Sequence, residues 1–443
     1  MTNHNQHLKG KKILFGTVPA DGHFNPLTGL AKYLQASGCD VRWYASPLFT
    51  KKLEKLGIQH YPFVKAQDIN QENLGTTLPQ RALIEDPAAK LDFDMIEVFA
   101  KRAPEYYEDI RDIYQSFPFD IMIADSVFTA IPLVKSGLNI PVLSIGIVPL
   151  AENSVDLAPY GMALPPATNE AEKAKYAELH ELMTTVVFKK STDIYDDILN
   201  SHKVPHKKSF LFDLLIREAS LYLQIGTPSF EYERSDMGKN VRFVGALMAY
   251  AEKRQTPWFD ERLKKYKKVI LLTQGTVEKD VNKLIIPALD AFKGSDVLVV
   301  TATANNQTAA LRAQYPHDNI IVEDYIPFDE IMPYASVYVT NGGYGGTLLS
   351  IKNKLPMVAA GIHEGKSEIC ARIGYFKLGL NLATDTPRPE QVKEAVNKIL
   401  ADSSYKAHIS RLADEINTYD AIETSAGYVA GLIKAHAARA IPQ

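Results

Sequence analysis

Short apolar runs alternate with segments of helical periodicity along most of the chain. Residues 12–18 form a largely apolar run, which is typical of a strand buried on both faces of a sheet. The next apolar residues recur at helical spacing: Leu27, Leu30, Ala31 and Leu34. Gly38 marks the end of this helix, and residues 40–45 predict the following strand. A strand, a helix and a strand in this order predict a parallel sheet with a right-handed crossover.

The same alternation continues and then begins a second time. Further strands are predicted at 120–125 and 141–146, and a new series starts at residues 268–276. A helix follows, with one apolar face made of Leu284, Ile285, Ala288, Leu289 and Phe292. The remaining strands are predicted at 296–303, 320–322, 337–339 and 357–360. We therefore predict an α/β fold of two Rossmann-like, doubly wound domains that face each other across a cleft, with ligand sites at the carboxyl ends of the strands.

At 443 residues the chain is too long for one ordinary core, which favours two domains. We expect the first domain over residues 1–237 and a connection rich in Lys and Arg over 238–266. The second domain is expected over 267–420, and residues 421–443 form a helix that packs back on the first domain. Residues 151–212, irregular at first and then helical and charge-rich, are expected to form an insertion over the cleft.

Composition excludes several classes of function. A hydrophobic content of 46% and a charged content of 23% are those of a soluble globular protein. The formal charge of -3 argues against a nucleic-acid partner, which requires a basic surface. No apolar run reaches the length that spans a bilayer, and the polar first residues contain no secretory signal, so the expected location is cytoplasmic. Cys39 and Cys370 lie in apolar surroundings and predict two buried thiols, with neither a disulfide framework nor a metal site.

Two turns between a predicted strand and a predicted helix carry candidate chemistry. The glycine-rich turn at 341–347 offers backbone amides and a helix N-terminus, which together form a cradle for phosphate. The turn at 21–26 carries the imidazole of His23. A base in one half and an anion cradle in the other favour transfer of a group from a phosphorylated donor.

One N-terminal segment and four regions of the second half resemble the motifs of nucleotide-sugar glycosyltransferases, in order and at matching spacing over nearly the whole chain. Residues 15–26 resemble the family's N-terminal G-H-x-x-P signature, and Gln274-Gly275-Thr276 resembles its S-x-G-T strand end. Residues 325–329 are similar to the W/Y-x-P-Q/H stretch that binds the base, and 341–347 to the H-G-G-x-G-T loop that binds pyrophosphate. The segments 355–358, 364–368 and 371–372 are similar to G-V-P and D-Q-x-x-N-A-x-R.

The resemblance implies the GT-B fold, with an acceptor-binding first domain and a second domain that binds the nucleotide sugar. It also implies inversion at the anomeric carbon without a metal or other bound cofactor. The donor is a UDP- or TDP-linked sugar, and the acceptor a small hydrophobic aglycone such as a flavonoid, a polyphenol or a macrolide. The donor contacts that it implies are Gly22, Gln274, Gly275, Thr276, Tyr325, Ile326, Phe328, Asn341, Gly343, Gly345, Gly346, Thr347, Glu364, Gly365 and Lys366.

The chemistry of the transfer favours His23 as general base. An acceptor hydroxyl is a poor nucleophile until a base removes its proton, and histidine is the side chain poised near neutral pH. Asp125 ends the predicted strand 120–125, so its carboxylate opens onto the same sheet edge, where it can stabilise the imidazolium. The alternative for Asp125 is a strand-end cap, and the alternative for Tyr325, beside stacking on the base, is a core aromatic.

The sequence departs from the family pattern at the donor site. Asn341 replaces the histidine of the pyrophosphate loop, so phosphate binding relies more on the backbone. Gly365 and Lys366 replace the Asp-Gln pair that holds sugar hydroxyls, and Leu349 stands where plant enzymes carry a ribose-binding glutamate. These changes favour an uncommon or deoxygenated sugar, such as rhamnose carried on TDP, with Glu364 able to compensate.

Other functions stay open on these residues. A GT-B-fold sugar-nucleotide epimerase, a phosphorylase and a non-catalytic sugar-nucleotide binding protein all use similar domains. His23 and the aromatic, proline-rich segment 151–166 favour an acceptor pocket and therefore transfer, and a phosphorylase's lysine-bound cofactor has no sequence signal. Asp92-Phe93-Asp94 matches the D-x-D motif of metal-dependent glycosyltransferases. Because it lies in a helical stretch and not at a strand end, we interpret it as a solvated pair.

Overall fold

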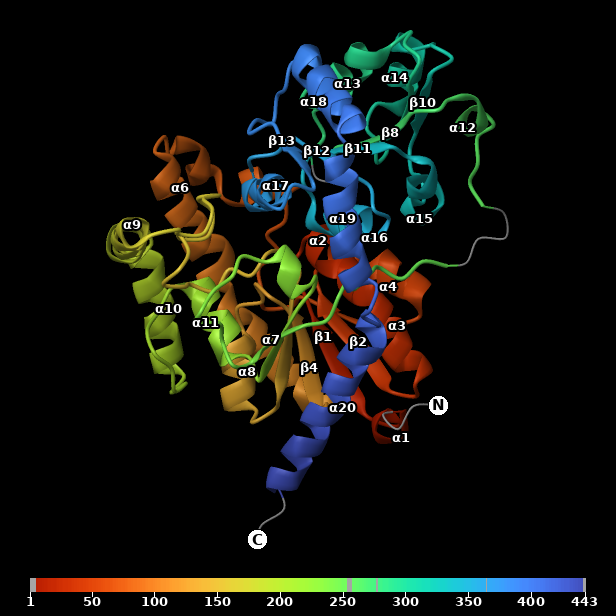
Figure 1. The fold of residues 1–443 in the computed structure, drawn as a ribbon. Coiled ribbons are helices and arrows are strands. Elements are labelled where there is room, and N and C mark those ends of the chain that lie inside the picture. Colours follow the sequence, from red (N-terminus) through yellow and green to blue (C-terminus); the bar gives the residue numbers. More distant parts are fainter. Residues whose placement is uncertain (1–4, 253–256, 276–277, 364, 441–443) are drawn as a thin grey trace.

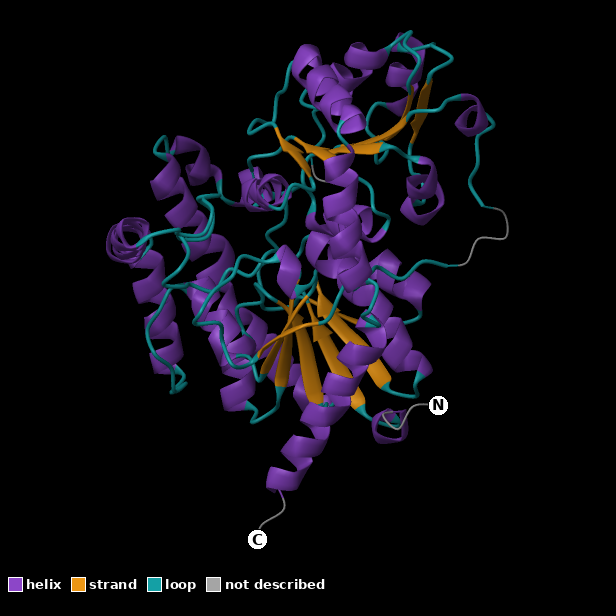
Figure 2. Ribbon diagram, viewed as in Figure 1, coloured by secondary structure: helices purple, strands orange, loops and turns teal. Residues whose placement is uncertain are grey.

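A computed structural model describes residues 5–252, 257–275, 278–363 and 365–440. These residues form two α/β units, each built on a parallel sheet flanked by helices (Figures 1 and 2). The first sheet has seven described strands in the order β3-β2-β1-β4-β5-β6-β7, and the second has six in the order β10-β9-β8-β11-β12-β13. The predicted pair of doubly wound domains is confirmed.

The first sheet consists of β1 Lys12–Gly16, β2 Asp40–Ala45, β3 Gln59–Pro62, β4 Ile121–Asp125, β5 Val142–Gly146, β6 Leu221–Gln224 and β7 Val241–Phe243. The second consists of β8 Val269–Thr273, β9 Leu298–Ala302, β10 Ile320–Glu323, β11 Val337–Thr340, β12 Met357–Ala359 and β13 Gly379–Asn381. Every strand predicted from an apolar run is present, whereas β3, β6, β7 and β13 were not foreseen. β7 lies within the stretch 238–266 and is an edge strand of the first sheet.

Helices cover both sheets, and the central strands are therefore buried along their whole length. In the first half the main helices are α2 Asp21–Phe24, α3 Thr28–Ala36, α4 Thr50–Leu56, α6 Pro87–Asp94, α7 Arg102–Ser116, α8 Ile131–Gly137, α9 Glu170–Leu182, α10 Lys189–Ser201 and α11 Leu211–Glu218. In the second half they are α13 Ile285–Phe292, α14 Thr308–Gln314, α15 Phe328–Ile331, α16 Tyr344–Lys352, α17 Lys366–Tyr375, α18 Pro389–Ala401 and α19 Ser403–Ile416.

The last helix, α20 Ala421–Ala440, returns to the first domain, as predicted. Figure 1 shows it running from the second domain down along the first. The hydroxyl of Tyr33 on α3 donates a hydrogen bond to the carboxylate of Glu423 on α20. The end of the chain therefore ties the two domains together.

The domains meet through the loops at the carboxyl ends of their strands. Ile225, just after β6, accepts a hydrogen bond of 3.0 Å from the hydroxyl of Tyr344, the first residue of α16. The rings of Phe230 and Tyr344 stack with centroids 6.2 Å apart. The carboxyl edges of both sheets therefore face each other, which is where open α/β sheets bind ligands. Among the described residues, no helix is long and apolar enough to cross a membrane.

Candidate active site

The first half of the site lies where the strand order of the first sheet reverses. β1 and β4 are neighbours there, with Gly16 paired in register with Ala124. The chain leaves β1 through a short turn into α2, which carries His23, and Asp125 is the last residue of β4. This adjacency places two residues far apart in sequence at one edge, as the strand prediction required.

Asp125 holds the ring of His23. The Nδ1 of His23 lies 3.0 Å from Oδ1 of Asp125. The same carboxylate accepts the backbone N–H groups of Val18 at 2.9 Å and Val127 at 3.0 Å. The Asp125 side chain is fully buried, whereas 22% of the His23 side chain is exposed. Because Nδ1 faces a carboxylate acceptor, we assign the proton to Nδ1, which leaves the lone pair of Nε2 available.

The second half of the site is the glycine-rich turn between β11 and α16. Gly342 has a φ of +82°, a conformation that favours glycine, and Gly343 is the N-cap of α16. A Cβ atom built on Gly343 or Gly345 would meet no atom within 4 Å, so this side of the turn is open. The space beside the helix N-terminus is therefore open at these two positions, as an anion cradle requires.

Two members of the same motif have other contacts. A Cβ on Gly346 would lie 2.9 Å from the hydroxyl of Tyr338, so this glycine allows close packing and does not face the open side. Thr347 is buried, and its hydroxyl donates to the carbonyl of Gly343 at 3.0 Å. The open part of the turn is thus formed by Gly343 and Gly345.

The buried amides of Asn341 and Gln274 organise the neighbouring loop. The Asn341 side chain donates a hydrogen bond to the carbonyl of Gln274. The Gln274 side chain accepts N–H groups from Leu284 and Ile285 at 3.0 and 3.2 Å and donates to the carbonyl of Asp280 at 2.7 Å. Both side chains therefore bind protein groups. Gly275 has a φ of +75° and continues the same turn.

A shallow hollow lies at this edge of the second sheet. It is lined by Gln274, Glu278, Lys283, Leu284, Asn341, Ala360, Gly361, Ile362, His363, Lys366 and Asp385. The charged residues among them were not foreseen, apart from Lys366. The ammonium group of Lys283 lies 2.7 Å from Glu278 and 3.0 Å from Asp385, and His363 lies 3.2 Å from Asp385. No local motif connects these positions, which only the fold brings together.

Lys283 also controls the charge of this hollow. Burial disfavours the ionised form of Asp385, but the hydrogen bond and the charge of Lys283 outweigh it, so the pKa of Asp385 is lowered. The carboxylate is therefore charged at neutral pH and pairs with the cation.

The stretch expected to bind the base is divided between core and surface. Tyr325 is 59% exposed and its hydroxyl accepts a hydrogen bond of 3.1 Å from Asn305, so it is not a core aromatic. Ile326 is buried, and the Phe328 ring packs edge-on against Tyr338. Of the three side chains, that of Tyr325 is the exposed one.

Four expected donor contacts remain: two are glycines, and two lie outside the residues that the structure describes. A Cβ on Gly22, beside His23, would meet nothing within 4 Å. Gly365 is the N-cap of α17 and has a φ of +75°. Thr276 and Glu364 lie outside the described residues.

The Asp92–Asp94 pair has structural partners on and near α6. Asp94 forms a two-pronged ion pair with Arg81 at 2.6 and 2.8 Å, and Asp92 accepts the N–H of Ser191 at 3.2 Å. Neither carboxylate is simply solvated, so the interpretation as a solvated pair was wrong. In the part of the chain that the structure describes, no group of three or more His, Cys, Asp or Glu could hold a metal ion.

Comparison with known proteins agrees with this architecture. Residues 287–422 match the family model described as erythromycin biosynthesis protein CIII-like, C-terminal domain. The chain is 31% identical to 4'-demethylrebeccamycin synthase of Lentzea aerocolonigenes over 96% of its own length and 100% of the relative. It is 30% identical to UDP-glucosyltransferase 1 of Beauveria bassiana over 93% of its length and 94% of that relative.

Solved structures show the same fold. The glycotransferase of kitacinnamycin superposes with a TM-score of 0.73 at 18% identity, covering 96% of this chain and 100% of that one. The calicheamicin glycosyltransferase CalG4 gives 0.72 at 18% identity, covering 98% and 100%. The architecture is thus that of a GT-B glycosyltransferase. The chain belongs to the family of nucleotide-sugar-dependent glycosyltransferases of the macrolide and UDP-glycosyltransferase type.

Proposed function

We propose that this glycosyltransferase inverts the anomeric carbon and moves a hexose or deoxyhexose from a UDP- or TDP-linked donor to a hydroxyl of a small hydrophobic aglycone. A flavonoid, a polyphenol or a macrolide fits this description. The observation that carries the proposal is the His23–Asp125 pair at 3.0 Å, on the sheet edge that faces the open glycine turn of the second domain. The relative named 4'-demethylrebeccamycin synthase supports the choice of a small-molecule acceptor, and the relative named UDP-glucosyltransferase 1 supports a nucleotide-linked sugar donor.

In this mechanism His23 acts as the general base. Its Nε2 takes the proton of the acceptor hydroxyl while the oxygen attacks the anomeric carbon. The bond from that carbon to the diphosphate oxygen breaks on the opposite face, which inverts the configuration. Asp125 keeps the ring oriented through Nδ1 and stabilises the imidazolium as it forms. The three hydrogen bonds that hold the carboxylate preserve this geometry during the proton transfer.

The second domain stabilises the leaving diphosphate. The N-terminus of α16 begins at the open positions Gly343 and Gly345, and we expect its amides and dipole to favour negative charge there. We assign the nucleobase to the exposed ring of Tyr325, because an aromatic face stacks on a base. The sugar then lies toward Gly365 and Lys366. The amides and the dipole supply the stabilising charge, so the proposed reaction runs without a bound metal.

Direct detection of the glycoside product tests the proposal. The purified full chain is incubated with UDP-glucose, TDP-glucose or TDP-rhamnose and a panel of flavonoid, polyphenol and macrolide aglycones. We expect a glycoside of the matching mass, with the anomeric configuration of the donor inverted. A changed nucleotide sugar without any glycoside would indicate an epimerase instead. Binding of donor without any product would indicate a non-catalytic binding protein.

A further inference from the structure

A side chain of the first domain approaches position 365, where the family pattern has an aspartate and this chain has a glycine. Gly365 has no side chain, and a Cβ built on it would lie 3.3 Å from the hydroxyl oxygen of Tyr160. Tyr160 belongs to the loop between β5 and α9, residues 147–169, in the first domain. The phenol hydroxyl therefore occupies the neighbourhood in which a carboxylate at position 365 would stand.

The backbone on either side of Tyr160 is held by one buried carboxylate of α17. Oε1 of Glu368 accepts the N–H of Gly161 at 2.8 Å and that of Ala163 at 2.7 Å. Both residues have positive φ values, +103° and +54°, so the loop bends tightly around this oxygen. Oε2 of Glu368 pairs with Arg372 at 2.8 Å. Glu368 thus determines where the loop presents Tyr160.

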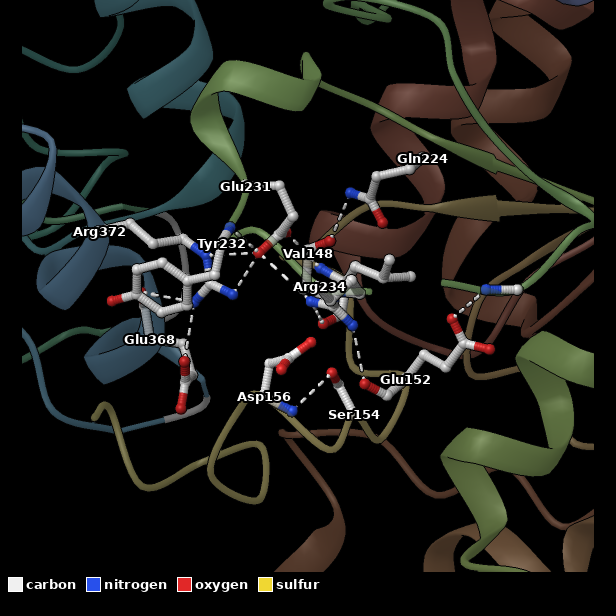
Figure 3. Close-up of polar contacts among 12 residues, drawn as sticks. Val148, Glu152, Ser154, Asp156, Gln224, Glu231, Tyr232, Arg234, Glu368 and Arg372 are labelled. Carbon is white, nitrogen blue, oxygen red and sulfur yellow. Dashed lines mark hydrogen bonds and ion pairs between the residues drawn. The ribbon is translucent and has the colours of Figure 1, made fainter. Parts of the chain in front are cut away.

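A second carboxylate holds the beginning of the same loop. Arg372 is fully buried and donates to Oε1 of Glu231 from Nε at 3.0 Å and from Nη2 at 2.5 Å (Figure 3). Oε2 of Glu231 accepts the N–H of Leu150 at 2.8 Å. The guanidinium of Arg372 also lies 4.1 Å from the ring centroid of Tyr232. The loop is therefore anchored near both ends to the helix that begins beside Gly365.

The hydroxyl of Tyr160 differs from these anchored groups. Within the described residues its side chain forms no hydrogen bond, although it lines a small hollow together with Glu368 and Arg372. Burial raises the pKa of Tyr160, so the phenol keeps its proton and can donate. A polar group that is held in place and has no protein partner is suited to bind a ligand group.

We propose that Tyr160 is a specificity-determining residue for the donor sugar, and that Glu368 is the residue that positions it. The Tyr160 hydroxyl would hydrogen-bond a sugar hydroxyl at the place left by the missing carboxylate of position 365. This inference rests on the proposed function, because it needs a nucleotide sugar with its sugar beside Gly365. It also makes donor selection dependent on a residue of the acceptor-binding domain.

The test compares single hydroxyl groups of the donor. Wild type, Tyr160→Phe and the control Tyr334→Phe, which removes an exposed hydroxyl elsewhere, are assayed with UDP-glucose or TDP-glucose and each monodeoxy analogue. A neutral hydrogen bond of this kind changes kcat/KM by about 3- to 10-fold. For one sugar position we expect wild type and the control to discriminate against the deoxy analogue, and Tyr160→Phe to lose this discrimination. Affinity for UDP or TDP alone stays unchanged.

Glu368→Gln tests the positioning role. It keeps one acceptor oxygen but loses the charge that Arg372 and the two amides share. The deoxy ratio is the kcat/KM for the parent donor divided by that for one deoxy analogue. We expect Glu368→Gln to change the same deoxy ratio as Tyr160→Phe. The double variant should change it no further, because both substitutions act on one contact. Lower stability with unchanged deoxy ratios would mean a purely structural role.

The outcomes separate this inference from the function on which it rests. Turnover with every deoxy ratio unchanged in Tyr160→Phe would overturn the assignment of Tyr160 and leave the glycosyltransferase proposal standing. An absence of transfer from any nucleotide sugar would overturn both.

Discussion

At the scale of single residues, the decisive arrangement joins two side chains that are 102 positions apart. The side-chain carboxylate of Asp125 is fully buried and takes part in three hydrogen bonds, one of which joins it to His23. The backbone N–H groups of Val18 and Val127 therefore hold the carboxylate of Asp125 in place independently of His23. Among the described residues, none hydrogen-bonds the outer nitrogen of the imidazole, which is the requirement for a base that serves an external hydroxyl.

The first prediction removes this base. In His23→Ala we expect transfer to fall by about 10²–10⁴-fold, the usual contribution of a general base. The rise in melting temperature produced by UDP or TDP should remain, because the base contacts the acceptor and not the diphosphate. Asp125→Asn should reduce transfer less, since an amide still orients the ring. His202→Ala, at an exposed helix end, is the control. Full activity in His23→Ala would exclude the assignment.

A second prediction concerns the buried carboxyl of Glu152, whose side chain is 2% exposed. Burial raises the pKa of Glu152 above its ordinary value of 4.5, although the N–H of Gly238 and nearby arginines oppose this. The folded state therefore holds this proton more tightly than the unfolded state, and the contribution to stability falls as pH rises from 4.5 through the folded pKa.

Glu152→Gln removes that titration. We expect the melting temperature of the variant, relative to wild type, to increase as the pH is raised from 4.5 toward neutral. Thermal unfolding followed across this range measures it. Glu85→Gln, an exposed position, should show a constant difference from wild type. A constant difference for Glu152→Gln as well would refute the effect.

At the scale of elements, the glycine turn and α16 are the part of the candidate site in which the space around each glycine is best defined. Its open face is formed by Gly343 and Gly345, whereas Gly346 serves packing against Tyr338. The motif alone treats these glycines as equivalent. Their difference depends on the neighbouring strand β11, which supplies Tyr338.

This difference selects the variant that tests the cradle. In Gly345→Val the branched side chain would fill the space open to the diphosphate, and we expect loss of UDP and TDP binding without loss of fold. Gly431→Val is a matched control, because Gly431 is also a helical glycine with open space around its Cβ. Both variants replace glycine by valine, which has the higher helix propensity, so this effect on the helix is shared, and only the first should lose the thermal shift caused by nucleotide. Unchanged nucleotide affinity in Gly345→Val would place the diphosphate elsewhere.

The elements that sequence analysis predicted are those with a buried apolar run. β4 and β8 lie in the middle of their sheets and are buried at every residue, which makes the pattern readable. β3, with sequence QHYP, and β13, with GLN, lie at sheet edges and are partly exposed. Such short edge strands form because a neighbouring strand offers hydrogen bonds. The local sequence does not show which strand will be the neighbour, so these strands could not be predicted.

The same limit applies to the site. The meeting of His23 and Asp125 was predictable, because both follow strands whose carboxyl ends share an edge. Lys283 and Asp385 were not, because each lies in a segment without a motif. Tyr160 belongs to the segment 151–166 expected at the acceptor pocket, but its approach to Gly365 could not be predicted. Glu368 belongs to a stretch compared with the family pattern, but its bonds to Gly161 and Ala163 depend on how the two domains meet.

At the scale of the whole molecule, the two domains share a buried ionic cluster. Arg372 lies between Glu231 of the first domain and Glu368 of its own helix, and it is 2% exposed. A buried ion pair contributes little over a well-packed apolar substitute, but removing one partner leaves an uncompensated charge. The cluster therefore makes the relative position of the domains sensitive to a single side chain.

Arg372→Met should destabilise the protein by about 3–5 kcal/mol, because two buried carboxylates lose their shared cation. Since the contact joins the domains, we also expect the unfolding transition in urea to separate into two steps. Far-ultraviolet circular dichroism measures both effects. Arg411→Met, an exposed change on α19, is the control. The triple variant with Glu231→Gln and Glu368→Gln should recover part of the loss, because both carboxylates that paired with Arg372 are neutral, although buried Arg234 then loses its own pair with Glu231. A triple variant less stable than Arg372→Met would mean that the carboxylates stabilise the loop independently of the arginine.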